Sequence, residues 1–172
     1  TGVQCDHPAL KEKYRGYNPA TGQVSHDYNW FDATSAGQAT PCDDQDHGTH
    51  VTGTMVGSEP NGSNQIGVAP GAKYIAVKAF TANGGSDVDL LEAAQWILAP
   101  TDANGNPRVD MAPDVVNNSW GGGPGLDEWY RDVVINWRAA EIFPEFSAGN
   151  TTFSNPGGAG SVAAPANYPE SF

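Results

Sequence analysis

The sequence predicts an α/β fold in which a parallel sheet lies between two layers of helices. Three observations support this: short apolar runs typical of buried strands, amphipathic segments between them, and 21 glycines and 13 prolines, which favour many tight loops over a helical bundle. The 172 residues correspond to about one domain. No repeat or charge block divides the chain, so we expect one domain over residues 1–172.

The expected elements alternate between strands and helices along most of the chain. In order they are a strand at 28–31, a helix at 47–57, a strand at 73–80, a helix at 87–99, a strand at 114–120, a helix at 126–137 and a strand at 142–148. The run at 73–80 is almost continuously apolar, as in strands buried on both faces. Strand–helix–strand connections of this length favour right-handed crossovers and parallel pairing.

The two later helices show recognisable ends and faces. Ser86 is a candidate N-cap, since Asp87 and Asp89 would lie in the first turn, where the helix dipole favours acidic side chains. The apolar residues expected on the buried face of this helix are Leu90, Leu91, Ala94, Ile97 and Leu98. For the last helix we expect a stripe that runs from Leu126 to Trp137. In such folds the chemistry lies at the carboxyl ends of the strands.

Composition excludes several classes of function. The formal net charge is -12, so the surface repels nucleic-acid phosphates and anionic lipid, and we expect neither partner. No apolar run approaches the roughly 18 residues of a membrane span. The two cysteines, Cys5 and Cys42, lack the C-x-x-C spacing of a zinc or redox site.

The strongest local signal is the segment at 43–54, where three aspartates come before two histidines. His47 and His50 are three residues apart, but the H-E-x-x-H pattern of zinc hydrolases is absent. We therefore expect His50 to be a buried structural histidine. His47 would open a helix beside the carboxylates, and Gly48 after it would allow another backbone to approach closely. A metal-dependent hydrolase that uses both histidines remains a less favoured alternative.

Four segments together carry a resemblance to a known family. They are residues 1–3 with 7–10, residues 47–54, residues 118–122 and residues 147–150. In this order they resemble the subtilisin-like serine proteases, or subtilases, and most closely one group of secreted bacterial enzymes. The resemblance covers essentially the whole chain and implies a subtilisin-like three-layer fold. It also implies a serine endopeptidase that acts on protein or peptide substrates.

The resemblance implies roles for individual residues. His47 matches the general base, which takes the proton of a serine hydroxyl and returns it to the leaving amine. Asn150 matches the oxyanion-hole asparagine, whose neutral amide donates without titrating. The residues that resemble the two segments flanking the substrate chain are Gly84, Gly85 and Ser86 and Ser119, Trp120 and Gly121. Without the family, Gly84 and Gly85 are equally read as an ordinary turn.

Two parts of the family pattern do not occur in the 172 residues. The catalytic aspartate would stand immediately before Thr1, and the Gly-Thr-Ser motif that carries the nucleophile is absent. The resemblance therefore predicts a partial catalytic domain, truncated at both ends, that is inactive and of low stability alone. A subtilase relative that binds without catalysis is the main alternative to the enzyme.

The resemblance also bears on cofactors, cysteines and location. It implies secretion, and we expect Cys5 and Cys42 to form a disulfide, because both flank segments that meet in subtilases. The chemistry requires no cofactor, and the family allows a structural calcium ion with ligands that the sequence leaves unassigned. The pattern Asp102-x-Asn104-x-Asn106 is a poor calcium loop, because Pro107 stands where the glycine is needed.

Overall fold

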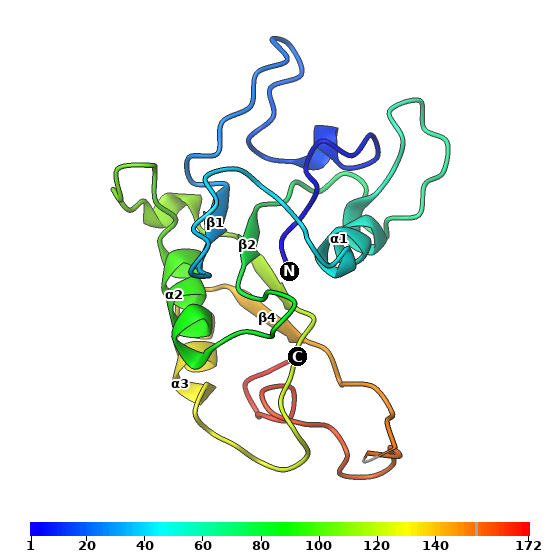
Figure 1. The fold of residues 1–172 in the computed structure, drawn as a ribbon, viewed down its shortest axis with the longest axis vertical. Helices are drawn as coiled ribbons and strands as arrows, with labels where there is room; N and C mark the ends of the chain where they lie inside the picture. Colours follow the sequence, from blue (N-terminus) through cyan, green and yellow to red (C-terminus); the bar gives the residue numbers. More distant parts are fainter. Residues whose placement is uncertain (154) are drawn as a thin grey trace. The chain divides into compact units, whose positions relative to one another are not determined.

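The chain folds into two units, Thr1–Met111 and Ala112–Phe172. The computed structural model describes every residue except 154. Each unit contains a pair of parallel strands and at least one helix (Figure 1), so the predicted α/β class is confirmed. Among the described residues no helix is long and apolar enough to cross a membrane.

The first unit is built on two short parallel strands, β1 (Trp30–Asp32) and β2 (Ala76–Lys78). Trp30 lies opposite Ala76, and Asp32 lies opposite Lys78. The predicted strand at 28–31 begins later because Tyr28 has a positive φ of 65°, which interrupts the extended backbone. The ladder is therefore three residues long, shorter than the apolar run at 73–80 suggested.

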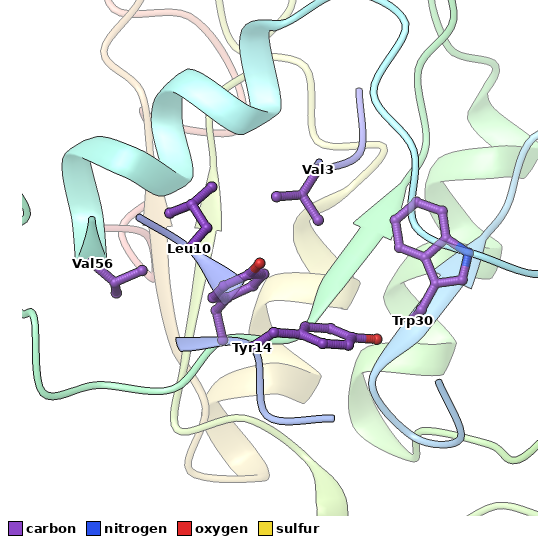
Figure 2. Packing of buried hydrophobic residues seen from close by; sticks show 6 residues of the cluster. Val3, Leu10, Tyr14, Trp30 and Val56 are labelled. Atoms are coloured by element: carbon purple, nitrogen blue, oxygen red, sulfur yellow. The ribbon is translucent and has the colours of Figure 1, made fainter. Parts of the chain in front are cut away.

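Helix α1 (His47–Val56) lies where the sequence predicts it. Its buried residues are Thr52 and Val56, and Val56 belongs to the core cluster with Val3, Leu10, Tyr14, Trp30 and Tyr74. Figure 2 shows Val3 and Leu10 near α1, which carries Val56, and Trp30 farther away on β1. Val3 is completely buried in this cluster, so the first residues of the chain are held by apolar contacts.

Helix α2 (Asp87–Leu98) has the N-terminus that the sequence predicts. The Ser86 hydroxyl accepts the Asp89 N–H at 3.1 Å, and the Asp89 carboxylate accepts the Ser86 N–H at 3.2 Å, which forms a capping box. The buried face differs from the prediction, since Leu91 is exposed. The buried residues are Leu90, Ala93, Ala94, Trp96 and Ile97. The Trp96 ring stacks on Phe31 of β1 at 5.7 Å, so this face turns toward the strand.

The second unit pairs β3 (Val115–Asn118) with β4 (Phe143–Phe146) in parallel. Helix α3 (Arg131–Ala139) packs on this pair through Trp137, whose ring lies 6.5 Å from that of Phe146. The predicted helix start at 126 is wrong. Leu126 is exposed outside the helix, because Gly125 at a φ of 110° directs the chain into a turn before Arg131.

The remaining described helices are two single 3₁₀ turns, Lys11–Lys13 and Val109–Met111. They lie in loops, as expected for such short pieces. The strands of the described residues thus form two parallel pairs, each with loops that carry predicted site residues at its carboxyl edge. This is the edge at which parallel α/β sheets place their chemistry.

Candidate active site

His47 is the first residue of α1 and its side chain is exposed to solvent. The residue before it, Asp46, is the N-cap and has a left-handed φ of 61°, and its carboxylate makes no capping hydrogen bond. The free N–H groups of the first turn are capped from elsewhere. Thr1 Oγ accepts the Gly48 N–H at 2.8 Å, and Asp43 accepts the Thr49 N–H at 2.7 Å.

The Asp43 carboxylate is the main acceptor at this helix end. Besides the Thr49 N–H, it accepts the Thr49 hydroxyl at 2.6 Å and the Gln45 N–H at 3.2 Å. Burial alone would raise the pKa of Asp43, but these hydrogen bonds lower it overall. A carboxylate that stays ionised at a helix N-terminus is stabilised by the helix dipole. The Gln4 N–H then binds the Thr49 hydroxyl at 3.0 Å, which ties the segment at 1–4 to α1.

Two glycines let the backbones at this point approach each other. A Cβ on Gly48 would lie 2.0 Å from the carbonyl oxygen of Gly2. Gly2 itself has a φ of 97°, and a Cβ there would lie 1.9 Å from the Cys42 carbonyl oxygen. The close approach predicted at Gly48 is therefore present, and its partner is the segment at 1–3.

Lys78, the last residue of β2, is buried directly beneath this junction. Its ammonium group donates to the Thr1 carbonyl at 2.9 Å and to the Asp44 carboxylate at 2.5 Å. The hydrogen bond from Lys78 lowers the pKa of Asp44. Figure 1 shows the N-terminus between β2 and α1, in agreement with these contacts. One buried cation thus holds two of the segments that surround His47.

His50 is exposed, so the prediction of a buried structural histidine is wrong. The side of α1 that faces the core carries Thr52 and Val56. His50 lies about 200° around the helix from Thr52, on the solvent side. Within the described part of the chain, no group of three or more His, Cys, Asp or Glu side chains could hold a metal ion.

The second unit brings two predicted segments together at one edge of its sheet. Ser119 and Trp120 follow β3, and the loop to Asn150 follows β4. The Ser147 N–H donates to the Asn118 carbonyl at 3.0 Å, so the segments that follow β3 and β4 leave the sheet side by side. Asn150 and Gly121 are both exposed there.

The indole of Trp120 is held in a fixed orientation. Its N–H donates to Asn118 Oδ1 at 3.2 Å, and its ring meets Tyr130 and Phe146 edge to face at 5.1 and 5.6 Å. Asn118 is itself buried and donates its amide to the Glu145 carbonyl at 3.1 Å. The segment at 119–121 is therefore anchored by a packed tryptophan, while its glycine stays accessible.

The segment at 84–86 has a local structural function as well. Thr81 and Gly84 bond to each other across a tight turn, in which Gly84 has a φ of 97°. A Cβ on Gly85 would lie 2.5 Å from the Ala79 carbonyl oxygen, so glycine is required there. The Ser86 hydroxyl caps α2 and is already engaged. The backbone N–H and carbonyl of Gly84 are thus both engaged within the turn.

Cys5 and Cys42 are free, partly buried thiols in this structure, and the predicted disulfide between them is not formed. The Val3 N–H donates to the Cys42 carbonyl at 3.1 Å, so Val3, and not Cys5, lies opposite Cys42.

In the weak calcium pattern at 102–106, the Asp102 carboxylate is hydrogen-bonded within its own loop. Asp102 accepts the N–H groups of Asn104 and Asn106, both at 2.9 Å, and the Asn106 side-chain amide at 2.9 Å. The hydrogen bonds from Asn106 lower the pKa of Asp102. These contacts are those of a loop stabilised by its own aspartate.

Sequence reasoning missed the residues that hold His47 in place, namely Thr1, Asp43 and Lys78. A signal existed only for Lys78, as a charged residue within the apolar run at 73–80. Thr1 and Asp43 belong to segments noted for other reasons. Their capping of α1 depends on contacts between residues 47 and 6 positions apart, which no local pattern shows.

Comparison with known proteins places these features in a family. A family model described as the subtilase family matches residues 1–172. Bacillopeptidase F of Bacillus subtilis (strain 168) is 71% identical over 173 residues, which is 100% of this chain and 12% of that protein. An extracellular protease of Xanthomonas campestris is 32% identical over 70% of this chain and 21% of its own length.

A solved structure supports the fold. The protein titled S41 psychrophilic protease superposes with a TM-score of 0.69 at 24% identity, over 96% of this chain and 47% of that one. The chain thus spans about half of that protease and about an eighth of bacillopeptidase F. The group of secreted bacterial enzymes that the sequence resembles is that of bacillopeptidase F.

The junction at Gly48 leads to a prediction with a matched control on the same helix. Gly48→Ala would push a methyl group into the Gly2 carbonyl, so we expect a loss of about 1–3 kcal/mol in the free energy of unfolding. Gly53→Ala has open space around its Cβ and should gain up to about 1 kcal/mol from helix propensity. Urea unfolding of the two variants measures both. Equal effects at the two positions would contradict the close approach.

The free thiols lead to a second prediction. Burial raises the pKa of both Cys5 and Cys42, and at Cys5 the nearby Asp6 adds to the effect. Less thiolate is then present at a given pH, so alkylation without reductant should label two thiols per chain, more slowly than a free cysteine and faster as the pH rises. Mass spectrometry reads the result. Labelling that requires prior reduction would restore the predicted disulfide.

Proposed function

Because this chain belongs to the subtilase family, we propose that the protein containing it is a serine endopeptidase that hydrolyses peptide bonds through an acyl-enzyme. The single observation that carries the proposal is the exposed imidazole of His47 on a helix end that contacts from Thr1 and Asp43 hold in place. A general base needs such a combination, since it must be accessible to substrate and fixed in direction.

In this proposal His47 takes the proton of the serine hydroxyl during attack on the scissile carbonyl. It then returns that proton to the leaving amine, and repeats the transfer with water to release the acyl group. The family's nucleophile motif Gly-Thr-Ser does not occur in these 172 residues. The activity therefore belongs to the longer protein, and we expect residues 1–172 alone to lack it.

Asn150 is proposed to stabilise the oxyanion of the tetrahedral intermediate. Its exposed position after β4 suits a donor that must meet a substrate, and its amide donates at any working pH. The segment at 119–121 follows β3, which the Ser147 N–H joins at the Asn118 carbonyl. An exposed glycine such as Gly121 leaves backbone groups open to an extended peptide, which can add as a strand.

The segment at 84–86 is also proposed to bind substrate. Gly85 offers backbone without a side chain, while Gly84 shapes the turn and Ser86 fixes the start of α2. Substrates are proteins or peptides, and the chemistry itself needs no cofactor. Secretion is also part of the proposal, supported by relatives whose names describe extracellular proteases.

Substitution of the histidines in the longer protein tests the proposal. His47→Ala should lower kcat on the order of 10⁶-fold, a magnitude taken from the triad histidine of subtilisin itself. The matched control is His50→Ala, three residues along the same exposed helix end, which should stay within a few-fold of the parent. The measurement is steady-state hydrolysis of a peptide amide, with circular dichroism as the check on folding.

Inhibitors separate this function from its alternatives. Activity that a serine-directed fluorophosphonate abolishes and a chelator spares supports the serine endopeptidase. Activity lost to a chelator, or to His50→Ala but not to His47→Ala, would instead indicate a metal-dependent hydrolase. Peptide binding without turnover in the longer protein would point to a non-catalytic relative.

A substitution at Asn150 tests the oxyanion assignment. Asn150→Ala removes the donor, and we expect kcat to fall about 100- to 1000-fold, the range known for the corresponding asparagine of subtilisin. KM should change little, because the interaction is made in the transition state. Asn150→Asp keeps the size, lacks the donor and should do no better. A raised KM with unchanged kcat in both variants would show that Asn150 only binds substrate.

A further inference from the structure

We propose that Lys78 is a positioning residue for the catalytic step, because its buried ammonium group holds the two segments that set the place of His47. The inference rests on the proposed function, in which His47 is the general base. Lys78 reaches the junction through the Thr1 carbonyl and the Asp44 carboxylate. It acts through these groups and is not itself placed on the substrate.

The burial of Lys78 is the first argument. Its side chain is only 3% exposed, at the end of a strand drawn from an otherwise apolar run. An ammonium group loses its hydration there, which is costly unless the group is paired and hydrogen-bonded. An apolar residue would suit the same strand position without that cost. The charge is therefore explained by what it binds rather than by the packing of β2.

The connectivity around Lys78 is the second argument. One arm runs from Lys78 Nζ to the Thr1 carbonyl at 2.9 Å, and Thr1 Oγ in turn accepts the Gly48 N–H at 2.8 Å. Gly48 is the residue next to His47. The other arm binds Asp44 at 2.5 Å, two residues before the N-cap of α1. The backbone is thus held on both sides of the imidazole.

The contacts of Lys78 with Asp44 and with Thr1 differ in what their loss would do. The Asp44 side chain is 54% exposed, so its carboxylate can be solvated if Lys78 is removed. The Thr1 arm acts on a residue whose own hydroxyl caps Gly48, so losing it disturbs the position next to His47 directly. We therefore assign the larger effect to the Thr1 arm. Asp44→Asn should consequently be milder than Lys78→Met.

The consequence for catalysis follows from the geometry that a general base requires. The imidazole must lie within about 3 Å of the proton that it takes. A displacement on the order of 1 Å can cost about 100-fold in rate. Loss of the Lys78 contacts should thus appear in kcat, while substrate binding by the segments at 84–86 and 119–121 stays largely intact.

The test compares four substitutions in the longer protein that carries this chain. Lys78→Met removes the charge but keeps the length, and Lys78→Arg keeps the charge and the donors. Asp44→Asn removes the second arm alone. Lys73→Met is the matched control, an exposed lysine that donates to the Glu12 carbonyl, away from His47. The readouts are kcat, KM and hydrogen exchange of the Gly48 amide, which reports the Thr1 contact without any need for activity.

For Lys78→Met we expect kcat to fall about 100-fold, KM to stay within about threefold, and the Gly48 amide to exchange at least about tenfold faster. Lys78→Arg should recover part of both losses, and Lys73→Met should match the parent. Parent-like kcat in Lys78→Met, or a fall in kcat with unchanged Gly48 exchange, would overturn the proposal. If Lys78→Met does not fold, Lys78→Arg decides by the same two readouts.

The outcome is separable from that of the proposed function. If His47→Ala retains parent activity, the assignment of the general base fails. Gly48 exchange in Lys78→Met still shows whether Lys78 holds the junction. If His47→Ala is inactive and Lys78→Met behaves like the parent in both readouts, only the positioning proposal fails.

Discussion

The start of helix α1 depends on hydrogen bonds from outside the helix, and the rest of the first unit is arranged to supply them. Asp46 is the N-cap residue of α1, but its carboxylate accepts none of the N–H groups of the first turn. Thr1 and Asp43 provide the acceptors instead. A helix end left uncapped loses stability, so this constraint brings the N-terminal segment, the loop at 41–46 and α1 to one point.

The surrounding residues explain how three backbones share so small a space. Gly2 and Gly48 approach where no side chain would fit, and Val3 is buried in the core on the next position of the chain. Lys78 then supplies a positive charge beneath the junction, opposite the acidic loop. Packing, backbone shape and charge thus act on the same few residues. Such contacts fix the direction in which the His47 imidazole leaves the helix.

In the second unit, aromatic packing holds the segment at 119–121 in place. Trp120 packs against Tyr130 and Phe146, and Tyr130 in turn contacts Trp137. The neighbouring Gly121 remains exposed. Aromatic rings at these separations resist rotation, because edge-to-face contacts favour one arrangement. The loops after β3 and β4 are held close together by the bond from Ser147 to Asn118. A peptide site built on such loops would need little reordering when substrate binds.

The sequence by itself determined the α/β class, the position of α1, the N-cap at Ser86 and the family, because each depends on local patterns or on motifs. It also indicated the close approach at Gly48. Only the tertiary structure decided that His50 faces solvent, that α3 begins at Arg131 and that Val3 rather than Cys5 lies opposite Cys42. The face of a helix and the register of two chains are set by long-range packing. The contacts of Lys78 with Thr1, 77 positions away, belong to the same class.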